Sequence, residues 1–307
     1  MIEIKEKAWN PRIIQNATLI TNGSGFMRTY DLNNGEILKL IKSKSELEDK
    51  EASYYDDFID CLYKKLFYAG DIDDKSILLP TCVYFDGEIK GYTMPRVNDK
   101  IELATLLEKP NNRPNSLEEK ANILIALSEK VKKLNEDGII FPDLANASNT
   151  FFDKKSREFT FIDYDGLQIQ DASTYSFSSL LLNVFYNLLS DKKYLDANSK
   201  LFTSNLDKYS LLLLFIYYTT GKCISDIIPR SPYFFLPCDS EMDNKRLFED
   251  FFSSIGISDT DVSSLIEDAY NYDVDNQYPD SAIKKLVKDY NLVSIGNGGY
   301  FRRKSRR

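Results

Sequence analysis

The sequence contains no histidine. This absence excludes Ser-His-Asp and Cys-His nucleophilic catalysis, most zinc hydrolase sites, and proton transfer through imidazole. Any chemistry that the chain performs must therefore use carboxylates, lysine, asparagine, tyrosine, serine or a bound metal ion.

Cysteine is also scarce, and its few positions form no recognisable motif. Cys61, Cys82, Cys223 and Cys238 are widely spaced and include no CxxC pair. This spacing suggests neither a zinc site nor a disulfide framework. We therefore expect a protein of a reducing compartment, the cytoplasm.

Long apolar runs are missing as well. The N-terminal residues MIEIKEKAWNP lack the basic start and apolar core of a signal peptide. The most apolar run is LLLLFIYY at residues 211–218, which is far shorter than the ~20 residues that a membrane-spanning helix needs. The sequence predicts no membrane anchor.

The overall composition is that of a folded protein with a substantial core. Of the 307 residues, 43% are apolar and 13% aromatic, which is enough for one large domain or two lobes. A net charge of −8 argues against general binding to nucleic acid or anionic membranes. The one basic cluster, RRKSRR at residues 302–307, is either a solvated tail or a docking segment for an acidic partner.

The first hundred residues alternate β-type segments with turns. Asn34-Gly35 and Asp86-Gly87 each separate two such segments, and tight hairpin turns need the positive φ that Asn, Asp and Gly adopt at low cost. Between the hairpins, residues 45–69 show a helical pattern with Ser45 and Glu48 as a capping box. We predict a small antiparallel sheet with one helix. Its strands would be residues 17–20, 26–32, 36–42, 82–85 and 88–94.

Helical periodicity dominates the remainder of the chain. Residues 116–138 form the clearest pattern, with Ser116 and Glu119 as a capping box and Gly138 at the C-terminal position. The chain after Ser173 is mainly helical by pattern. The change from β to helix near Pro95 predicts an α+β fold with two domains, residues 1–95 and residues 96–307.

The stretch FPDLANASNTFF at residues 141–152 places Asp143 and Asn149 between two apolar segments. The next residues predict a hairpin over 149–166 that turns at residues 154–157 and brings Asn149 roughly opposite Asp163. One amide and two carboxylates would then converge, and such oxygen ligands suit Mg²⁺. The alternative is that Asp143 and Asn149 are turn residues that bond to the local backbone.

A lysine and a glutamate in the N-terminal region form a second candidate pair. Strand alternation puts Lys39 on one face and Lys42 on the other, each with apolar residues, and the central position of Lys39 favours it as the inward lysine. An inward Lys39 needs a partner because an isolated buried charge costs several kcal/mol. Glu51 lies on the apolar stripe of the predicted helix and would satisfy it. Alternatively, Lys39 protects a sheet edge and Glu51 lies at the solvated border of the stripe.

The turn NGSG at residues 22–25 is the third candidate. Gly23, Ser24 and Gly25 would let backbone amides approach a phosphate closely. An ordinary hairpin turn is the alternative.

Taken in chain order, these features resemble the protein-kinase-like superfamily, including bacterial kinase-like proteins and phosphotransferases of the aminoglycoside and choline kinase type. The resemblance covers residues 17–190 and includes a Gly-rich hairpin, a strand lysine, a helix glutamate, a DLxxxxN loop and a hairpin that ends in IDYDG. It implies a bilobal fold, with a small antiparallel β N-lobe that carries one helix and a larger, mainly helical C-lobe.

The resemblance implies a role for each charged residue. Asp143 would orient the acceptor hydroxyl and take its proton, while Asn149 and Asp163 would bind Mg²⁺. Because IDYDG replaces the family's Asp-Phe-Gly, Asp165 is either a second carboxylate ligand or an alternative registration of that motif. Lys39 would hold the α- and β-phosphates of ATP, and Glu51 would pair with it. Residues 92–97 would form the hinge that binds adenine through the backbone, with Met94 and Arg96 on either side of Pro95.

Four positions depart from the family pattern. Phe141 replaces the histidine of the catalytic loop, and Arg28 stands where the third glycine of the phosphate loop would be. Asn149 comes one residue late, so either a bulge is required or Ser148 takes its position. Ser173 occupies the place of an aspartate that opens the next helix in the family.

The sequence thus predicts an ATP- and Mg-dependent phosphotransferase that acts on a hydroxyl of a protein Ser/Thr or of a small molecule. The alternative is a pseudokinase-like module that binds nucleotide or regulates a partner without turnover. Neither hypothesis requires nucleic acid or a membrane.

Overall fold

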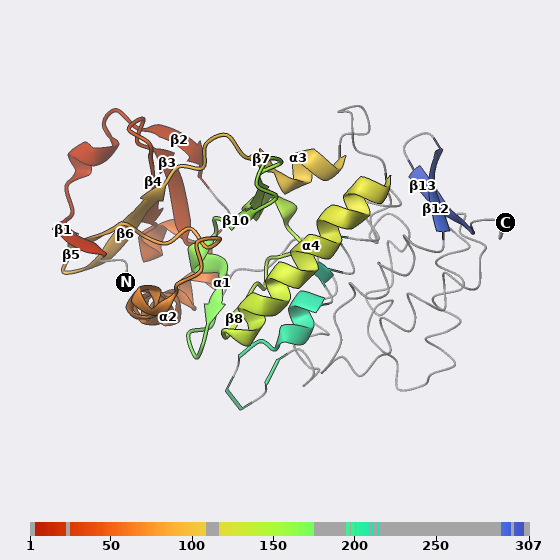
Figure 1. The fold of residues 1–307 in the computed structure, drawn as a ribbon. Helices are drawn as coiled ribbons and strands as arrows, with labels where there is room; N and C mark the ends of the chain where they lie inside the picture. The colour runs from red at the N-terminus through yellow and green to blue at the C-terminus, as the bar shows by residue number, and fades with distance from the viewer. Residues whose placement is uncertain are drawn as a thin grey trace. The chain divides into compact units, whose positions relative to one another are not determined.

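A computed structural model of the 307-residue chain divides into two compact units (Figure 1). The first unit comprises Met1–Ile101 and Phe151–Ser176, and the second comprises Glu102–Thr150 and Phe177–Arg307. The sequence predicts a boundary at residue 95 and a hairpin over 149–166 in the second domain. In the structure the boundary follows Ile101, and the hairpin belongs to the first unit from Phe151 on. The structure describes residues 4–22, 25–108, 117–174, 195–196, 198–199, 201–208, 210–211, 214, 290–295 and 298–303.

The first unit is built on a six-stranded sheet with the order β1-β5-β6-β4-β3-β2. Neighbouring strands are antiparallel, except that β1 pairs with β5 in parallel. The predicted antiparallel strands are therefore confirmed. β1 was not predicted because its residues KEKA show no apolar alternation, and all four are exposed. The strands are β1 (Lys5–Ala8), β2 (Thr18–Thr21), β3 (Met27–Asp31), β4 (Glu36–Ile41), β5 (Cys82–Asp86) and β6 (Glu88–Pro95).

Both predicted hairpins are confirmed, but positive φ is found at Asn33 and not at Asn34, and at Gly87 without Asp86. β3 and β4 are joined through Asn33 and Gly35, which have φ of 58° and 90°. β5 and β6 are joined through Gly87, which has φ of 72° and lies between the paired residues Asp86 and Glu88. Glycine meets this left-handed geometry without a steric penalty.

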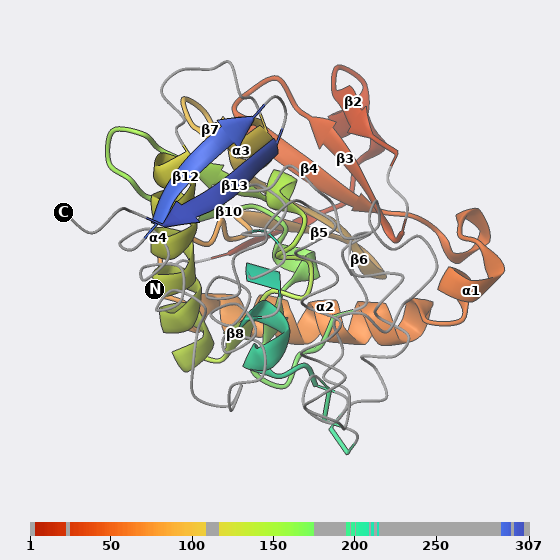
Figure 2. The same ribbon diagram turned by 90° about the vertical axis from the view of Figure 1, so that its right-hand side faces the viewer.

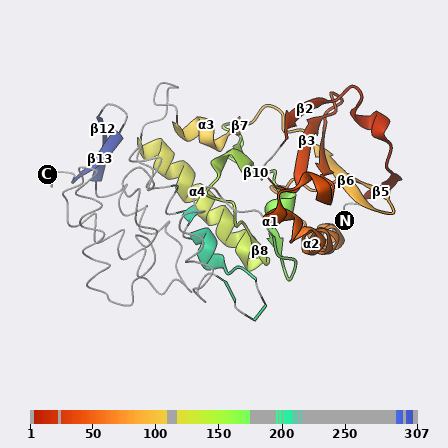
Figure 3. The ribbon, with the colours of Figure 1, turned by 180° about the vertical axis from the view of Figure 1, so that it is seen from behind.

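The helical segment between the hairpins is less regular than predicted. It consists of a 3-10 turn at Lys44–Glu46, α1 (Asp49–Ala52) and α2 (Tyr55–Tyr68), and not one helix over residues 45–69. The capping box uses Ser43 and Glu46, two residues before the predicted pair, because Glu46 accepts from the Ser43 N–H at 2.8 Å and also binds Arg28 at 2.7 Å. α2 runs beside the sheet near β5 and β6 (Figure 3).

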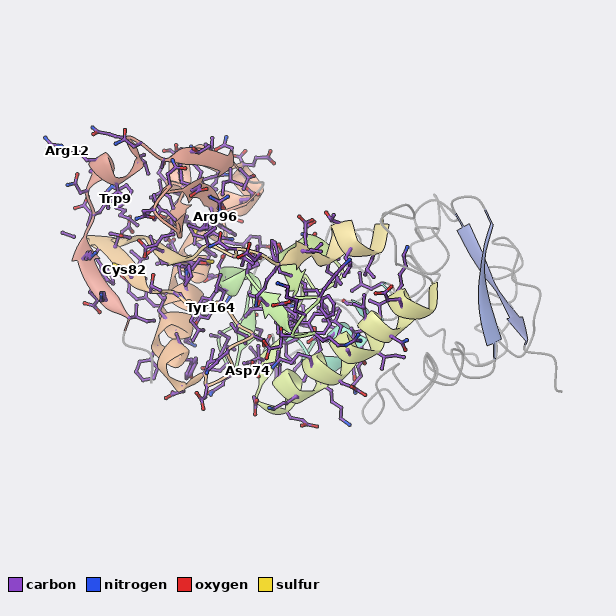
Figure 4. All side chains as sticks on the ribbon, turned by 45° about the horizontal axis from the view of Figure 1, so that its top comes forward. Trp9, Arg12, Asp74, Cys82, Arg96 and Tyr164 are labelled. Atoms are coloured by element: carbon purple, nitrogen blue, oxygen red, sulfur yellow. The ribbon has the colours of Figure 1, made fainter. Side chains whose placement is uncertain are left out.

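Two apolar layers enclose the sheet of the first unit. On one face Leu38, Cys82 and Tyr84 form a buried cluster, and Trp9 packs edge-to-face on Tyr84 (Trp9 and Cys82 are labelled in Figure 4). On the α2 side, the helix buries Phe58 and its apolar neighbours, and Phe58 stacks on Phe26 at 4.3 Å between ring centroids. Burial of this aromatic and aliphatic surface stabilises the unit.

The predicted hairpin after residue 149 is also observed. β9 (Thr150–Phe152) and β10 (Phe159–Phe161) are neighbours in one sheet, and the Asp153 N–H donates to the Glu158 carbonyl across the turn. Phe161 then pairs with the segment before β5, since its N–H donates to the Ser76 carbonyl at 2.7 Å. A 3-10 turn at Tyr164–Gly166 and β11 (Gln168–Ile169) follow.

The second unit contains the long helix that the sequence predicts. α4 (Leu117–Glu136) ends near Gly138, whose φ is 79°, while Ser116 lies outside the described residues. Residues 204–208, 210–211 and 214 are also helical. The other elements are β7 (Ile101–Glu102), where the chain enters this unit, α3 (Leu103–Glu108), β8 (Ile139–Ile140), a 3-10 turn at Ala147–Asn149, β12 (Tyr290–Ile295) and β13 (Gly298–Arg303).

Near the C-terminus the structure differs from the predicted helical pattern. β12 and β13 form an antiparallel hairpin in which Tyr290 pairs with Arg303 (Figure 2). Arg302 and Arg303 therefore belong to a strand, while the other residues of the basic cluster, 304–307, lie outside the described residues. Most of the predicted helical residues after Ser173 also lie outside them.

Across the described ranges, no helix is both long and apolar enough to cross a membrane. The chain is thus of mixed α and β structure with a mostly antiparallel main sheet.

Candidate functional site

Strand pairing fixes the direction of Lys39. In the register of the sheet Lys39 lies opposite Thr29 on one side and Tyr92 on the other, whereas Leu38 lies opposite Thr93. Paired residues share a face, so Lys39 and Tyr92 point away from the cluster around Leu38. The Lys39 side chain is only 14% exposed, which excludes the edge-protection alternative.

The partners of Lys39 come from the turn after β10. The Lys39 Nζ lies 2.6 Å from Asp163 Oδ1 and 3.1 Å from Asp165 Oδ1, and both carboxylates are largely buried. Lys39 and Asp163 are 124 positions apart in the sequence. One ammonium group thus bridges two carboxylates in the IDYDG motif.

Four further hydrogen bonds hold this turn. Tyr92, fully buried on β6, donates its hydroxyl to Asp165 Oδ1 at 2.6 Å. The Asp165 carbonyl accepts from Lys65 Nζ at 2.6 Å and from the Thr174 hydroxyl at 3.0 Å. Tyr164 in turn donates to the Lys65 carbonyl. The turn is therefore tied to β6 and to α2 through buried polar contacts, which are stronger in a low-dielectric interior.

The electrostatics of this cluster follow from burial and from the paired charges. Burial alone would lower the pKa of Lys39, but the carboxylates of Asp163 and Asp165 outweigh it and the pKa is raised. Burial raises the pKa of Asp163. For Asp165, Lys39 and the Tyr92 hydroxyl outweigh burial, and the pKa is lowered. Burial lowers the pKa of Lys65 to about 8 although Asp165 opposes this effect.

Gly166 leaves room for the Asp163 carboxylate. A Cβ at Gly166 would lie 2.2 Å from Asp163 Oδ2, a distance that atoms do not tolerate. The residue after Asp165 must therefore be glycine for Asp163 to keep this position.

In the second unit, Asp143 accepts two hydrogen bonds from asparagines. Its Oδ2 lies 2.7 Å from Asn149 Nδ2 and 3.2 Å from Asn146 Nδ2. The loop after Asp143 forms a 3-10 turn at Ala147–Asn149. Asn149 therefore reaches Asp143, whereas Ser148 is exposed. Asn146 had not been singled out from the sequence. Its carboxamide also caps the turn, because Oδ1 accepts from the Ser148 N–H.

The loop that carries Asp143 is anchored by a residue that sequence reasoning missed. Asp207, fully buried in the helix over 204–208, accepts from the Phe141 N–H at 2.9 Å and from Asn135 Nδ2 at 2.6 Å. The Phe141 side chain is itself buried. The Phe141 backbone N–H thus ties the loop to Asp207. The available signal was an aspartate four residues before the apolar run LLLLFIYY.

Asp207 gives the protein a predicted pH dependence. Burial raises its pKa to about 7, although Asn135 and the Phe141 N–H favour the charged form. Between pH ~4 and the raised pKa, the folded chain keeps a proton that the unfolded chain releases, so the free energy of unfolding falls as pH rises. The total fall would be on the order of 4 kcal/mol.

This slope can be isolated with an uncharged side chain at the same position. Between pH 5 and pH 8 we expect the free energy of unfolding to fall less in Asp207→Asn than in wild type. Urea denaturation of both proteins measures this difference. An identical pH dependence in wild type and variant would contradict the assignment.

Glu51 does not form the predicted ion pair. It lies in α1 and is half-buried, whereas the ion pairs of Lys39 are with Asp163 and Asp165. The predicted stripe assumed one continuous helix, and the break between α1 and α2 changes the direction of residues before Tyr55. The α2 residue that reaches the site is Lys65.

The predicted hinge residues are part of the sheet and its border. Met94 is buried and pairs with Ile37 on β4. The Arg96 N–H donates to the Gly35 carbonyl at 2.8 Å, and its guanidinium binds Asp31 at 2.6 Å. The Arg96 N–H is therefore already engaged.

The glycine-rich turn is only partly described. Gly25 has φ of 101°, which suits a tight turn, while Gly23 and Ser24 lie outside the described residues. Arg28, in the place of a third glycine, binds Glu46 and Asn22.

No family model matches the chain, and no curated protein matches it. In the part of the chain that the structure describes, no group of three or more acidic, Cys or His residues gathers as a metal centre. A magnesium site would therefore combine fewer carboxylates with amide oxygen, water or phosphate ligands, as Mg²⁺ sites commonly do.

Proposed function

We propose that this chain is an ATP- and Mg-dependent phosphotransferase of the protein-kinase-like type, which transfers the γ-phosphoryl group to a hydroxyl of a protein or of a small molecule. The observation that carries the proposal is the contact of Lys39, on an inner strand of an antiparallel sheet, with Asp163 and Asp165 of the IDYDG motif. A lysine and a carboxylate that meet at one point can bind phosphate and its metal ion together.

The residues present fit a magnesium nucleotide. Asp163 offers carboxylate oxygens, and the missing side chain at Gly166 leaves room for its Oδ2. These are hard oxygen ligands, as Mg²⁺ requires. Asp163 would hold the ion and Lys39 would hold the α- and β-phosphates. When bound, Mg²⁺ neutralises the charge that the phosphates develop during transfer.

Asp143 would act on the acceptor. Its Oδ2 is held by Asn149 and Asn146, which fixes the orientation of the carboxylate. A carboxylate in a fixed orientation can accept the proton of a hydroxyl as the hydroxyl attacks phosphorus. Most of the rate enhancement would come from alignment and electrostatic stabilisation, because phosphoryl transfer needs little covalent help.

A second candidate function is a nucleotide-binding or regulatory module without turnover. It is favoured by the engagement of the Arg96 N–H with the Gly35 carbonyl, which removes one hinge donor. It is also favoured by the ion pairs of Lys39, which would stabilise the fold even without a ligand.

A thermal-shift titration tests the nucleotide site that both functions share. We expect Mg-ATP to raise the unfolding temperature, since a ligand at 100 times its Kd stabilises the folded state by ~2.7 kcal/mol. Asp163→Asn should abolish most of this increase because the metal loses its charged ligand. The exposed Asp86 of the same unit provides a control, and Asp86→Asn should respond to Mg-ATP as wild type does.

Chelation of magnesium with EDTA should also remove the increase. An absence of any response in wild type would exclude the proposed function, and an equal response in Asp163→Asn would place the nucleotide elsewhere.

A further inference from the structure

We propose that Asp165 is the residue that positions Lys39 for nucleotide phosphates, in place of a helix glutamate and not as a second metal ligand. This inference rests on the proposed function, because it assigns the residue that orients the phosphate-binding lysine. Asp165 would be a positioning residue, since it acts through Lys39 and does not touch the substrate.

The first support is that one carboxylate oxygen of Asp165 binds two donors. Asp165 Oδ1 accepts from Lys39 Nζ at 3.1 Å and from the Tyr92 hydroxyl at 2.6 Å. Lys39 and Tyr92 are directly opposite each other on β4 and β6. The carboxylate therefore binds both members of one cross-strand pair, which fixes the ammonium group relative to the sheet.

The second support is the fixed backbone of Asp165. Its carbonyl accepts from Lys65 on α2 and from Thr174, and both donors belong to residues that are at most 4% exposed. Tyr164 closes the link by donating to the Lys65 carbonyl. A carboxylate on a backbone held from two sides can hold the lysine in one orientation.

The third support is the contrast with Asp163. Asp163 Oδ1 contacts Lys39, and its Oδ2 faces Gly166, where no side chain could be accommodated. Asp165 Oδ1 is instead occupied by a hydroxyl and an ammonium group. The two carboxylates thus divide two tasks, with Asp163 serving the metal and Asp165 serving the lysine.

The position of α2 explains why a helix glutamate is not needed. The α2 residue that contacts the turn is Lys65, a buried cation. A second carboxylate here would face Asp163 and Asp165, and like charges in a buried site repel strongly. The two lysines and two aspartates balance each other instead.

Three variants and two binding measurements separate the possible roles. Asp165→Asn should weaken Mg-ATP binding about 10- to 100-fold, the fold-change expected for one lost hydrogen bond to a charged group. Its affinity for Mn²⁺ alone, measured by electron paramagnetic resonance, should stay within about 2-fold of wild type. Asp163→Asn should lose Mn²⁺ affinity, and Glu51→Gln should change neither quantity.

A third measurement needs no nucleotide, so it tests the pairing of Lys39 with Asp165 even if the proposed function is wrong. The acylation rate of Lys39, followed by mass spectrometry across pH, should increase in Asp165→Asn because the amine loses a negative neighbour. Among the described residues, the charged groups that contact Lys39 are Asp163 and Asp165 on the turn, while Tyr92 on β6 and Lys65 on α2 bind Asp165. Tyr92→Phe keeps the Asp165 carboxylate but removes the hydroxyl that holds it. This variant should therefore increase the acylation rate of Lys39 less than Asp165→Asn does.

Each outcome decides between these roles. An equal loss of Mn²⁺ affinity in Asp165→Asn and Asp163→Asn would show a metal ligand and overturn the inference. A change of Lys39 reactivity in Glu51→Gln, with none in Asp165→Asn or Tyr92→Phe, would do the same. If wild type binds no nucleotide while Lys39 still responds to Asp165→Asn, the proposed function fails and the pairing of Lys39 with Asp165 stands.

Discussion

Asp143→Asn should lower kcat for ATP turnover by about 10²- to 10⁴-fold, the range that a positioned general base contributes. The amide cannot accept the proton of the hydroxyl, but it is similar in size to the carboxylate. Because Asp143 is not among the residues proposed to hold the nucleotide, Mg-ATP affinity should remain close to that of wild type. The measurement is release or transfer of γ-labelled phosphate, together with the thermal-shift titration described above.

The matched control for this variant is Asp137→Asn. Asp137 is an exposed aspartate just after α4 in the same unit, and its substitution should leave kcat unchanged. Turnover that is equal in wild type and Asp143→Asn would exclude Asp143 as the base. Nucleotide binding without turnover in wild type would favour the regulatory module.

Lys39→Met should destabilise the fold by about 3–5 kcal/mol, because removal of one partner leaves buried carboxylates without their counter-charge. Lys39 is 14% exposed and its two partners are 18% and 11% exposed, so water compensates only in part. The midpoint of urea denaturation should fall accordingly. The same variant should lose the thermal response to Mg-ATP.

Lys90→Met tests whether the effect is specific to the buried cluster. Lys90 binds Glu88 at 2.9 Å on the surface, where ion pairs contribute at most ~1 kcal/mol. Comparable losses of stability in Lys39→Met and Lys90→Met would contradict the energetic role assigned to the buried cluster.

Local turn chemistry made the sheet predictable from the sequence. Gly35 and Gly87 identify their hairpins because both have positive φ and both hairpins form, although in the first turn the other positive-φ residue is Asn33 and not Asn34. The capping box was wrong by two residues because a tertiary contact, Arg28 with Glu46, selects the position. β1 was missed because strand pairing alone, without an apolar pattern, creates it.

The charged groups of the candidate site were only partly predictable. Lys39 could be identified from its central position in the strand and Asp163 from motif order, and the structure brings them together. Lys65 was missed because Lys64 and Lys65 read as a solvated pair, and only the rotation of α2 decides which is buried. Asp207 was missed because its partner, the Phe141 N–H, lies 66 positions away.

The most direct test of the account is an experimental structure of the full chain with Mg²⁺ and a nonhydrolysable ATP analogue. We expect the α- and β-phosphates at Lys39, the metal ion bound by Asp163, and Asp165 still bonded to Lys39 and Tyr92. Nucleotide bound away from Lys39, or a metal ion that Asp163 does not bind, would contradict the proposed function.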